Sequence, residues 1–282
     1  MWVNRRSTRR SGALDVTNAS RRAGRVAAGV ALAAATVSTW GLEAQAATPH
    51  SLTLRATGAV GSTVTGADQF LVAGDTKVRV ALAAVDGGRL NVVAGPDQTL
   101  ARAWQFPTYR AAGTYPRASV SLTPTSGEGL SPGASDFRYG AVFRLDSSSS
   151  GRAADNGDNI FQRGRYTEPS MFKLQVDHGF PSCLVKGSQG PVLVQSSVKV
   201  TPGAWYSATC SRVGSTLTVT VLRYGQDGSA VRDVGVGSSG TLSFSANRAA
   251  SIGGKLVTSG TGVASSSDQL NGAVAEVSVN RL

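Results

Sequence analysis

One segment of the chain spells a serine-nucleophile motif, at residues 129–133 in the order Gly-Leu-Ser-Pro-Gly. A G-x-S-x-G turn places its serine beside an oxyanion hole, and one donor of that hole is the backbone N–H of the residue after the serine. In this chain that residue is Pro132, which has no N–H. We therefore interpret the motif as a set of turn residues, and no hydrolysis by Ser131 is expected.

Carboxylates are the second kind of residue that could do chemistry. Glycoside hydrolysis needs two acids flanking the scissile bond, but Glu128, Glu168 and Glu276 are each isolated. His178 beside Asp177 could suggest a base, yet neighbours on a strand point to opposite faces and the pair falls in a predicted hairpin turn. The sequence predicts no catalytic residues, and a glycoside hydrolase-like enzyme ranks as the third hypothesis.

Oxygen ligands are densest at Asp155, Asn156, Asp158 and Asn159. Hard oxygens on a loop suit Ca²⁺. The same residue types also build ordinary tight turns, and two carboxylates without a third, bidentate acid make a weak site. Two interpretations stay open, a Ca²⁺ site formed by these four residues and a turn without a metal.

The only two cysteines are Cys183 and Cys210. A metal site would need further ligands at short spacing, and the chain offers only His50 and His178 as histidines. An oxidising compartment favours the bridged form over a free thiol. The sequence predicts one disulfide, for which adjacent antiparallel strands could bring the two cysteines together, and such a closure is worth about 3–4 kcal/mol.

The N-terminal segment has the order of a secretory signal. Seven arginines between Arg5 and Arg25 precede an uncharged run at residues 26–42, and Ala44-Gln45-Ala46 matches a small-x-small cleavage pattern. The run is too short and too rich in Ala, Gly and Thr for a membrane anchor. We predict a signal peptide at residues 1–46, with either Sec or twin-arginine export, and a secreted domain at residues 47–282 without a membrane span.

Charge gives only a weak indication of partners. Cleavage would remove seven of the 28 basic and two of the 17 acidic residues, which leaves a net charge of +6. That charge favours weak attraction to anionic polymers or cell-wall surfaces, but no run of five or more basic residues occurs. A nucleic-acid partner is not expected.

Strand-like alternation fills the chain after the signal. In residues 137–145, the side chains of Phe137, Tyr139, Ala141, Phe143 and Leu145 fall on one face. Further strands are predicted at residues 52–56, 78–85, 119–122, 172–176, 192–195, 205–210, 217–224, 242–245 and 273–279, separated by Gly-rich turns. Many short, evenly spaced strands predict an all-β fold, a two-sheet antiparallel sandwich.

Three segments resemble the laminin G-like and concanavalin A-like jelly-roll domains, in a form typical of secreted proteins of high-GC bacteria. They are residues 158–164, residues 171–176 and residues 200–206 with the strand that follows, and residues 251–255 and 268–274 are similar to the family's closing strand. The resemblance covers residues 130–282 well and the earlier part loosely. It implies a jelly-roll sandwich, and we expect Trp205 to insert its indole between the two sheets.

The resemblance also implies carbohydrate or protein partners, sometimes through Ca²⁺. Tyr166 could stack on a sugar ring while Arg163 and Arg165 bind hydroxyl or carboxylate oxygens, and Trp104 and Tyr109 are second candidates. We predict a secreted, non-catalytic binding module for a polysaccharide or cell-envelope glycan. The alternative is a domain that binds an extracellular protein and has no sugar site.

Overall fold

The computed structural model describes residues 50–110, 114–125, 130–149, 156–225, 228–257 and 262–282. These residues belong to one compact unit, Ala47–Leu282. The predicted signal peptide lies outside the described residues and stays a prediction. In the described residues, no helix is both long and apolar enough to span a bilayer.

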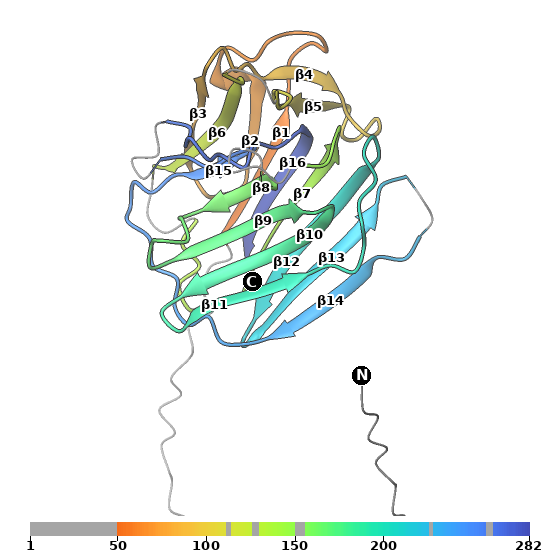
Figure 1. Cartoon of the computed structure of the whole chain (residues 1–282). Coiled ribbons are helices and arrows are strands. Elements are labelled where there is room, and N and C mark those ends of the chain that lie inside the picture. Colours follow the sequence, from red (N-terminus) through yellow and green to blue (C-terminus); the bar gives the residue numbers. More distant parts are fainter. Residues whose placement is uncertain (1–49, 111–113, 126–129, 150–155, 226–227, 258–261) are drawn as a thin grey trace, which may run out of the picture. The chain divides into compact units, whose positions relative to one another are not determined.

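The first of two antiparallel sheets, sheet A, runs in the order β14-β13-β12-β7-β16-β1-β2, with β5 also paired to β16 and β4 to β5 (Figure 1). Its strands are β1 (Ser51–Ala56), β2 (Phe70–Ala73), β4 (Asn91–Ala94), β5 (Arg102–Gln105), β7 (Phe137–Leu145), β12 (Trp205–Val213), β13 (Thr216–Arg223), β14 (Val231–Val236) and β16 (Gly272–Arg281).

The second sheet, sheet B, runs in the order β11-β10-β9-β8-β15-β6-β3. Its strands are β3 (Val78–Val85), β6 (Arg117–Pro124), β8 (Asp158–Arg163), β9 (Met171–Asp177), β10 (Phe180–Gly187), β11 (Gly190–Gln195) and β15 (Ala250–Ile252). One short 3₁₀ turn, η1 (Ala67–Gln69), precedes β2. The fold is the all-β, two-sheet antiparallel jelly-roll sandwich that the sequence predicts.

Alternation along each strand determines which side chains form the core. On β9, Phe172, Leu174 and Val176 are buried in the main hydrophobic cluster, whereas Lys173 and Gln175 lie on the opposite face of the strand. On β7 the same cluster takes Phe137, Tyr139, Ala141, Phe143 and Leu145, as predicted. The aromatic rings pack closely, with the Tyr139 and Phe172 centroids 5.0 Å apart.

The disulfide Cys183–Cys210 is confirmed, and its Cα atoms are 5.7 Å apart. Cys183 lies on β10 of sheet B and Cys210 on β12 of sheet A, and both are fully buried. The bond therefore joins the two sheets across the core. The expectation that adjacent antiparallel strands bring the cysteines together is wrong, because the strands belong to facing sheets.

Two further expectations are wrong. Trp205 does not enter the space between the sheets, because the inward positions of β12 begin at Tyr206. The indole is half-buried against a smaller cluster that includes Ala103 and Val142, with the Arg144 guanidinium 5.3 Å from its ring centroid. Residues 242–245 do not form a strand, since Leu242 makes only an isolated bridge to Gly133.

Candidate binding site

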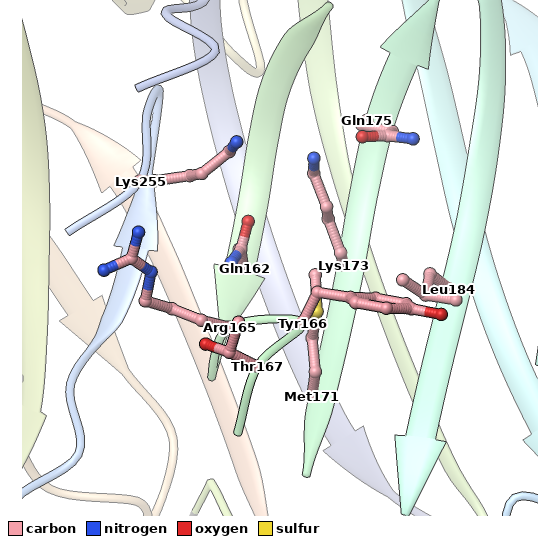
Figure 2. Close-up of a pocket in the computed structure, with 9 residues that line it drawn as sticks. All are labelled: Gln162, Arg165, Tyr166, Thr167, Met171, Lys173, Gln175, Leu184 and Lys255. Atoms are coloured by element: carbon pink, nitrogen blue, oxygen red, sulfur yellow. The ribbon is translucent and has the colours of Figure 1, made fainter. Parts of the chain in front are cut away.

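A pocket of about 230 Å³ lies on the outer face of sheet B. Its floor consists of outward-pointing side chains on three neighbouring strands, Gln162 on β8, Met171, Lys173 and Gln175 on β9, and Leu184 on β10. Strand pairing sets Gln162 opposite Lys173 and Lys173 opposite Leu184, so that these side chains form a row across the sheet. Figure 2 shows them together with the residues that border them.

The β8–β9 connection supplies Arg165, Tyr166 and Thr167 to the pocket. Gly164 starts this connection with a φ of 77°, and a Cβ there would lie 2.1 Å from the Ser170 carbonyl oxygen. Only glycine fits such a conformation without strain. The Gln162 Nε2 donates a hydrogen bond of 2.6 Å to the Gly164 carbonyl, which fixes the start of the loop against the strand.

Tyr166 is the exposed aromatic of the site, with 61% of its surface accessible. The Lys186 ammonium lies 5.0 Å from the Tyr166 ring centroid. The same ammonium donates to the carbonyl oxygens of Tyr166, at 2.6 Å, and Glu168, at 3.0 Å. Lys186 thus anchors both the ring and the backbone of the loop, and much of the tyrosine surface remains open to solvent.

Two lysines face a single carboxylate beside the pocket. The Asp268 Oδ2 lies 2.6 Å from the Lys255 Nζ and 3.4 Å from the Lys173 Nζ. Lys173 is almost completely buried, and this desolvation lowers its pKa to about 8, although Asp268 acts in the opposite direction and Lys255 adds to the decrease. Lys255 enters the site from the segment after β15 and is far from Lys173 in the sequence.

Buried polar atoms on the same face lack hydrogen-bond partners within the described part of the chain. They are the Gln162 Oε1, the Asn159 Oδ1 and Nδ2, and the Ser182 Oγ. Asn159 pairs with Gln175, and Gln175 pairs with Ser182. In Figure 2 the Gln162 oxygen points to the side where the Lys173 and Lys255 amines lie. The outer face of sheet B therefore carries unused hydrogen-bonding capacity.

Among the described residues, the pocket lining holds no pair of carboxylates of the kind that glycoside hydrolysis uses. Within the described chain, no acidic side chain lines it, and Asp268 beside it is engaged by two lysines. Asp177 is the last residue of β9 and His178 begins the turn that follows, with the His178 Nδ1 2.8 Å from the Asp177 Oδ1 and the His178 side chain highly exposed. Neither of the latter two residues lines the pocket.

Of the residues proposed from the sequence, Arg165 and Tyr166 line the pocket and Arg163 does not. Arg163 is 1% exposed and points into the protein, with its guanidinium 4.4 Å from the Phe244 ring centroid. Its Nε donates to the Arg248 carbonyl and its Nη1 to the Ser131 hydroxyl. Burial, and then the charge of nearby Arg248, lower the Arg163 pKa to about 9. The prediction that Arg163 contacts a ligand is therefore wrong, because its guanidinium is buried in the protein.

The other two aromatic candidates lie elsewhere. Trp104 lies on β5, which pairs with β4 on one side and β16 on the other, and it is fully buried. Its Nε1 donates to the Gln69 carbonyl at 3.3 Å. It cannot contact a ligand in solution, because the core covers the indole. Tyr109 is half-buried, and its ring packs edge-on against Tyr115 with centroids 4.8 Å apart. Neither residue lines the pocket.

Two of the four residues proposed for Ca²⁺, Asp158 and Asn159, lie in strand β8 and not in a loop. Asp155 lies outside the described residues, and Asn156 is exposed. Asp158 and Asn159 are buried at the start of β8, where the Asp158 Oδ1 accepts hydrogen bonds from the Asn271 backbone N, at 2.8 Å, and Nδ2, at 3.3 Å. Within the described residues, no group of three or more His, Cys, Asp or Glu is placed to hold a metal ion.

Sequence reasoning missed the lysines and glutamines of the pocket. The signal for Lys173 and Gln175 was present in the alternation of β9, where apolar residues occupy every second position. Alternation gives no such signal for Gln162, because β8 carries the consecutive apolar residues Ile160 and Phe161 and its register shifts between Asn159 and Phe161. No sequence pattern pointed to Lys255, because its place in the site depends on how the segment after β15 folds over the sheet.

Comparisons with known proteins find neither a matching family model nor a matching curated protein. Among solved structures, the binding domain of Paraclostridial mosquitocidal protein 1 is 8% identical, with a TM-score of 0.44 over 82% of this chain and 48% of that one. The enzymatically active domain of bacteriophage CBA120 tailspike protein 2 is 12% identical, with a TM-score of 0.47 over 72% of this chain and 29% of that one.

The LG1–3 region of the laminin α2 chain is 9% identical, with a TM-score of 0.41 over 81% of this chain and 61% of that one. The chain spans less than half of the length of the first three matched structures. At this level of identity the likeness concerns the fold alone.

Proposed function

We propose that this chain is a secreted, non-catalytic module that binds a carbohydrate on the outer face of sheet B. The observation that carries the proposal is the position of Tyr166, an exposed ring that Lys186 holds at the border of a polar pocket. An aromatic face beside amide and amine donors suits a sugar, whose ring presents C–H groups on one side and hydroxyls around its edge.

Secretion is part of the same proposal. The N-terminal segment has the pattern of a signal peptide, and the disulfide between β10 and β12 suits an oxidising compartment. The corresponding ligand is a polysaccharide or cell-envelope glycan outside the cell.

Binding to an array of soluble polysaccharides tests the function, with the wild-type chain compared with Tyr166→Ala. We expect affinity to fall about two- to tenfold in the variant, since contact with an aromatic ring is worth roughly 0.5–1.5 kcal/mol. Tyr109→Ala serves as the matched control, because Tyr109 lies outside the pocket. Equal loss in both variants, or no loss in Tyr166→Ala, would contradict the proposal.

A second function, protein binding without a sugar site, is favoured by exposed apolar side chains on the two edge strands β11 and β14. Leu193 is 60% exposed, Val234 53% and Val236 81%. Edge strands with apolar side chains are common sites for association. If Val236→Lys abolishes capture of an envelope protein while no glycan binds, this function replaces the first. An enzyme ranks third, and release of reducing ends from polysaccharides would establish it.

A further inference from the structure

The side chains that line the pocket carry an excess of positive charge. Arg165, Lys173 and Lys255 line it, and Lys186 lies at its border under Tyr166. Asp268 is the acid that the two pocket lysines share. Three cations against one carboxylate is an imbalance that a neutral ligand would leave uncompensated.

Among the cations of the pocket, Lys173 has the positive charge that is compensated least. Lys255 takes the short contact to the Asp268 Oδ2, at 2.6 Å, and leaves Lys173 at 3.4 Å from the same oxygen. Lys173 has only 7% of its side chain exposed, so that water compensates its charge poorly. Lys173 therefore has one long contact to a carboxylate that it shares with Lys255, and burial of an ammonium so paired is costly. A second carboxylate in the pocket would offset that cost.

Gln162 requires a hydrogen-bond donor on the ligand, whereas the lysines require a negative charge. Its Nε2 is committed to the Gly164 carbonyl, while its buried Oε1 has no partner within the described residues and can only accept a hydrogen bond. A simple anion offers no donor for this oxygen. A ligand that carries hydroxyl groups next to its negative charge satisfies both the lysines and the glutamine.

We infer that the pocket binds an acidic sugar unit, a uronic acid within a polysaccharide, with its carboxylate at Lys173 and Lys255, a hydroxyl at Gln162 and its ring against Tyr166. This inference rests on the proposed function, since it specifies the ligand class of the same site. The inference also explains why the pocket is positively charged, since a site for a neutral sugar needs no such charge.

The test measures binding of a polyuronate oligosaccharide and of the same oligosaccharide after its carboxyl groups have been reduced to alcohols. We expect the acidic form to bind at least about tenfold more tightly, as one charge-assisted hydrogen bond contributes roughly 1.5–3 kcal/mol. Lys255→Gln should abolish most of this preference, because it removes one of the two ammonium groups assigned to the carboxylate. Lys77→Gln removes the same charge at an exposed position outside the pocket and should change nothing.

Lys255→Gln is preferred to a change at Lys173 because Lys255 is more exposed. Melting curves of Lys255→Gln and Lys77→Gln would show whether these two variants fold. Equal affinity for acidic and reduced forms, together with loss of binding in Tyr166→Ala, would overturn the inference and leave the proposed function intact. Binding of a sulfated or phosphodiester polymer but not of the polyuronate would overturn the inference as well. Absence of binding to any polysaccharide, acidic or neutral, would overturn both.

Discussion

The Tyr139 hydroxyl on β7 of sheet A lies 3.2 Å from the Lys173 carbonyl oxygen on β9 of sheet B. It also lies 3.2 Å from the carbonyl oxygen of Leu184, the partner of Lys173 on β10. Tyr139 therefore crosses the core and meets the sheet directly behind the pocket floor, where the side chains of Lys173 and Leu184 point outward. The backbone of β9 and β10 is thus bound by the core on one side and carries the pocket side chains on the other.

Tyr139→Phe tests this connection. The variant keeps the ring in the core and removes one hydroxyl donor, so that the free energy of unfolding should fall by about 1 kcal/mol. Urea denaturation followed by intrinsic fluorescence measures the change. Unchanged stability would mean that the hydroxyl contributes nothing to the contact between the sheets.

Loss of the disulfide should have a larger effect. The double variant Cys183→Ala/Cys210→Ala removes the covalent link between facing sheets. The two cysteines are 27 positions apart, and for such a loop the chain-entropy model predicts that the free energy of unfolding falls by roughly 3–4 kcal/mol. Denaturation of the oxidised wild type, the reduced wild type and the double variant provides the comparison. Equal midpoints for the oxidised and reduced wild type would contradict the prediction.

The buried lysine predicts opposite pH dependences for stability and for binding. The folded-state pKa of Lys173 is about 8, against 10.5 in the unfolded chain. Between these values the unfolded state binds more protons, so that the contribution of Lys173 to stability rises with pH. Below about pH 8 the lysine is charged in both states, and the cost of its burial is fully present.

Binding of an acidic sugar requires the charged lysine, so affinity should fall as the pH rises through about 8. Calorimetric titration with a polyuronate oligosaccharide at pH 7 and pH 9 measures this effect, and thermal melting over the same range measures stability. In Lys173→Met, the rise of stability with pH and the fall of affinity with pH should both become smaller, because the titrating amine is gone. An affinity in the wild type that is constant across this range would contradict the assignment.

Lys186 should control affinity through Tyr166. Lys186→Met keeps most of the aliphatic stem and removes the ammonium that contacts the ring and two carbonyl oxygens of the loop. We expect saccharide affinity to fall about two- to fivefold, as a cation–π contact at an exposed site is worth roughly 0.5–1 kcal/mol. Lys199→Met is the control, since Lys199 faces the Phe180 ring at 5.8 Å away from the pocket.

Asp158 should stabilise the fold independently of any metal. Asp158→Ala removes the acceptor of two hydrogen bonds from Asn271 and leaves buried donors unsatisfied, so that stability should fall by about 2–3 kcal/mol. Melting temperatures of the wild type and the variant with Ca²⁺ and with chelator provide the measurement. A loss that occurs only when Ca²⁺ is present would restore the metal interpretation.

The sequence by itself determined several of the strands. The alternation of residues 137–145 predicted β7 with its bounds, and residues 78–85 gave β3 in the same way. It also determined the disulfide, since the chain contains two cysteines only, and placed Arg165 and Tyr166 in a loop marked by Gly164. Each of these features depends on local spacing, which a sequence records directly.

Tertiary structure decided which side chains are covered. Trp104 and Trp205 look alike in the sequence, yet Trp104 is fully buried and Trp205 is half-exposed on the outer side of β12. Arg163 and Arg165 are two positions apart, and only Arg165 reaches the pocket. Burial depends on which distant strand packs over a residue, and the Lys173–Asp268–Lys255 cluster likewise joins separate segments. Such long-range packing leaves no periodic trace in the local sequence, so the charge of the site emerged only from the folded chain.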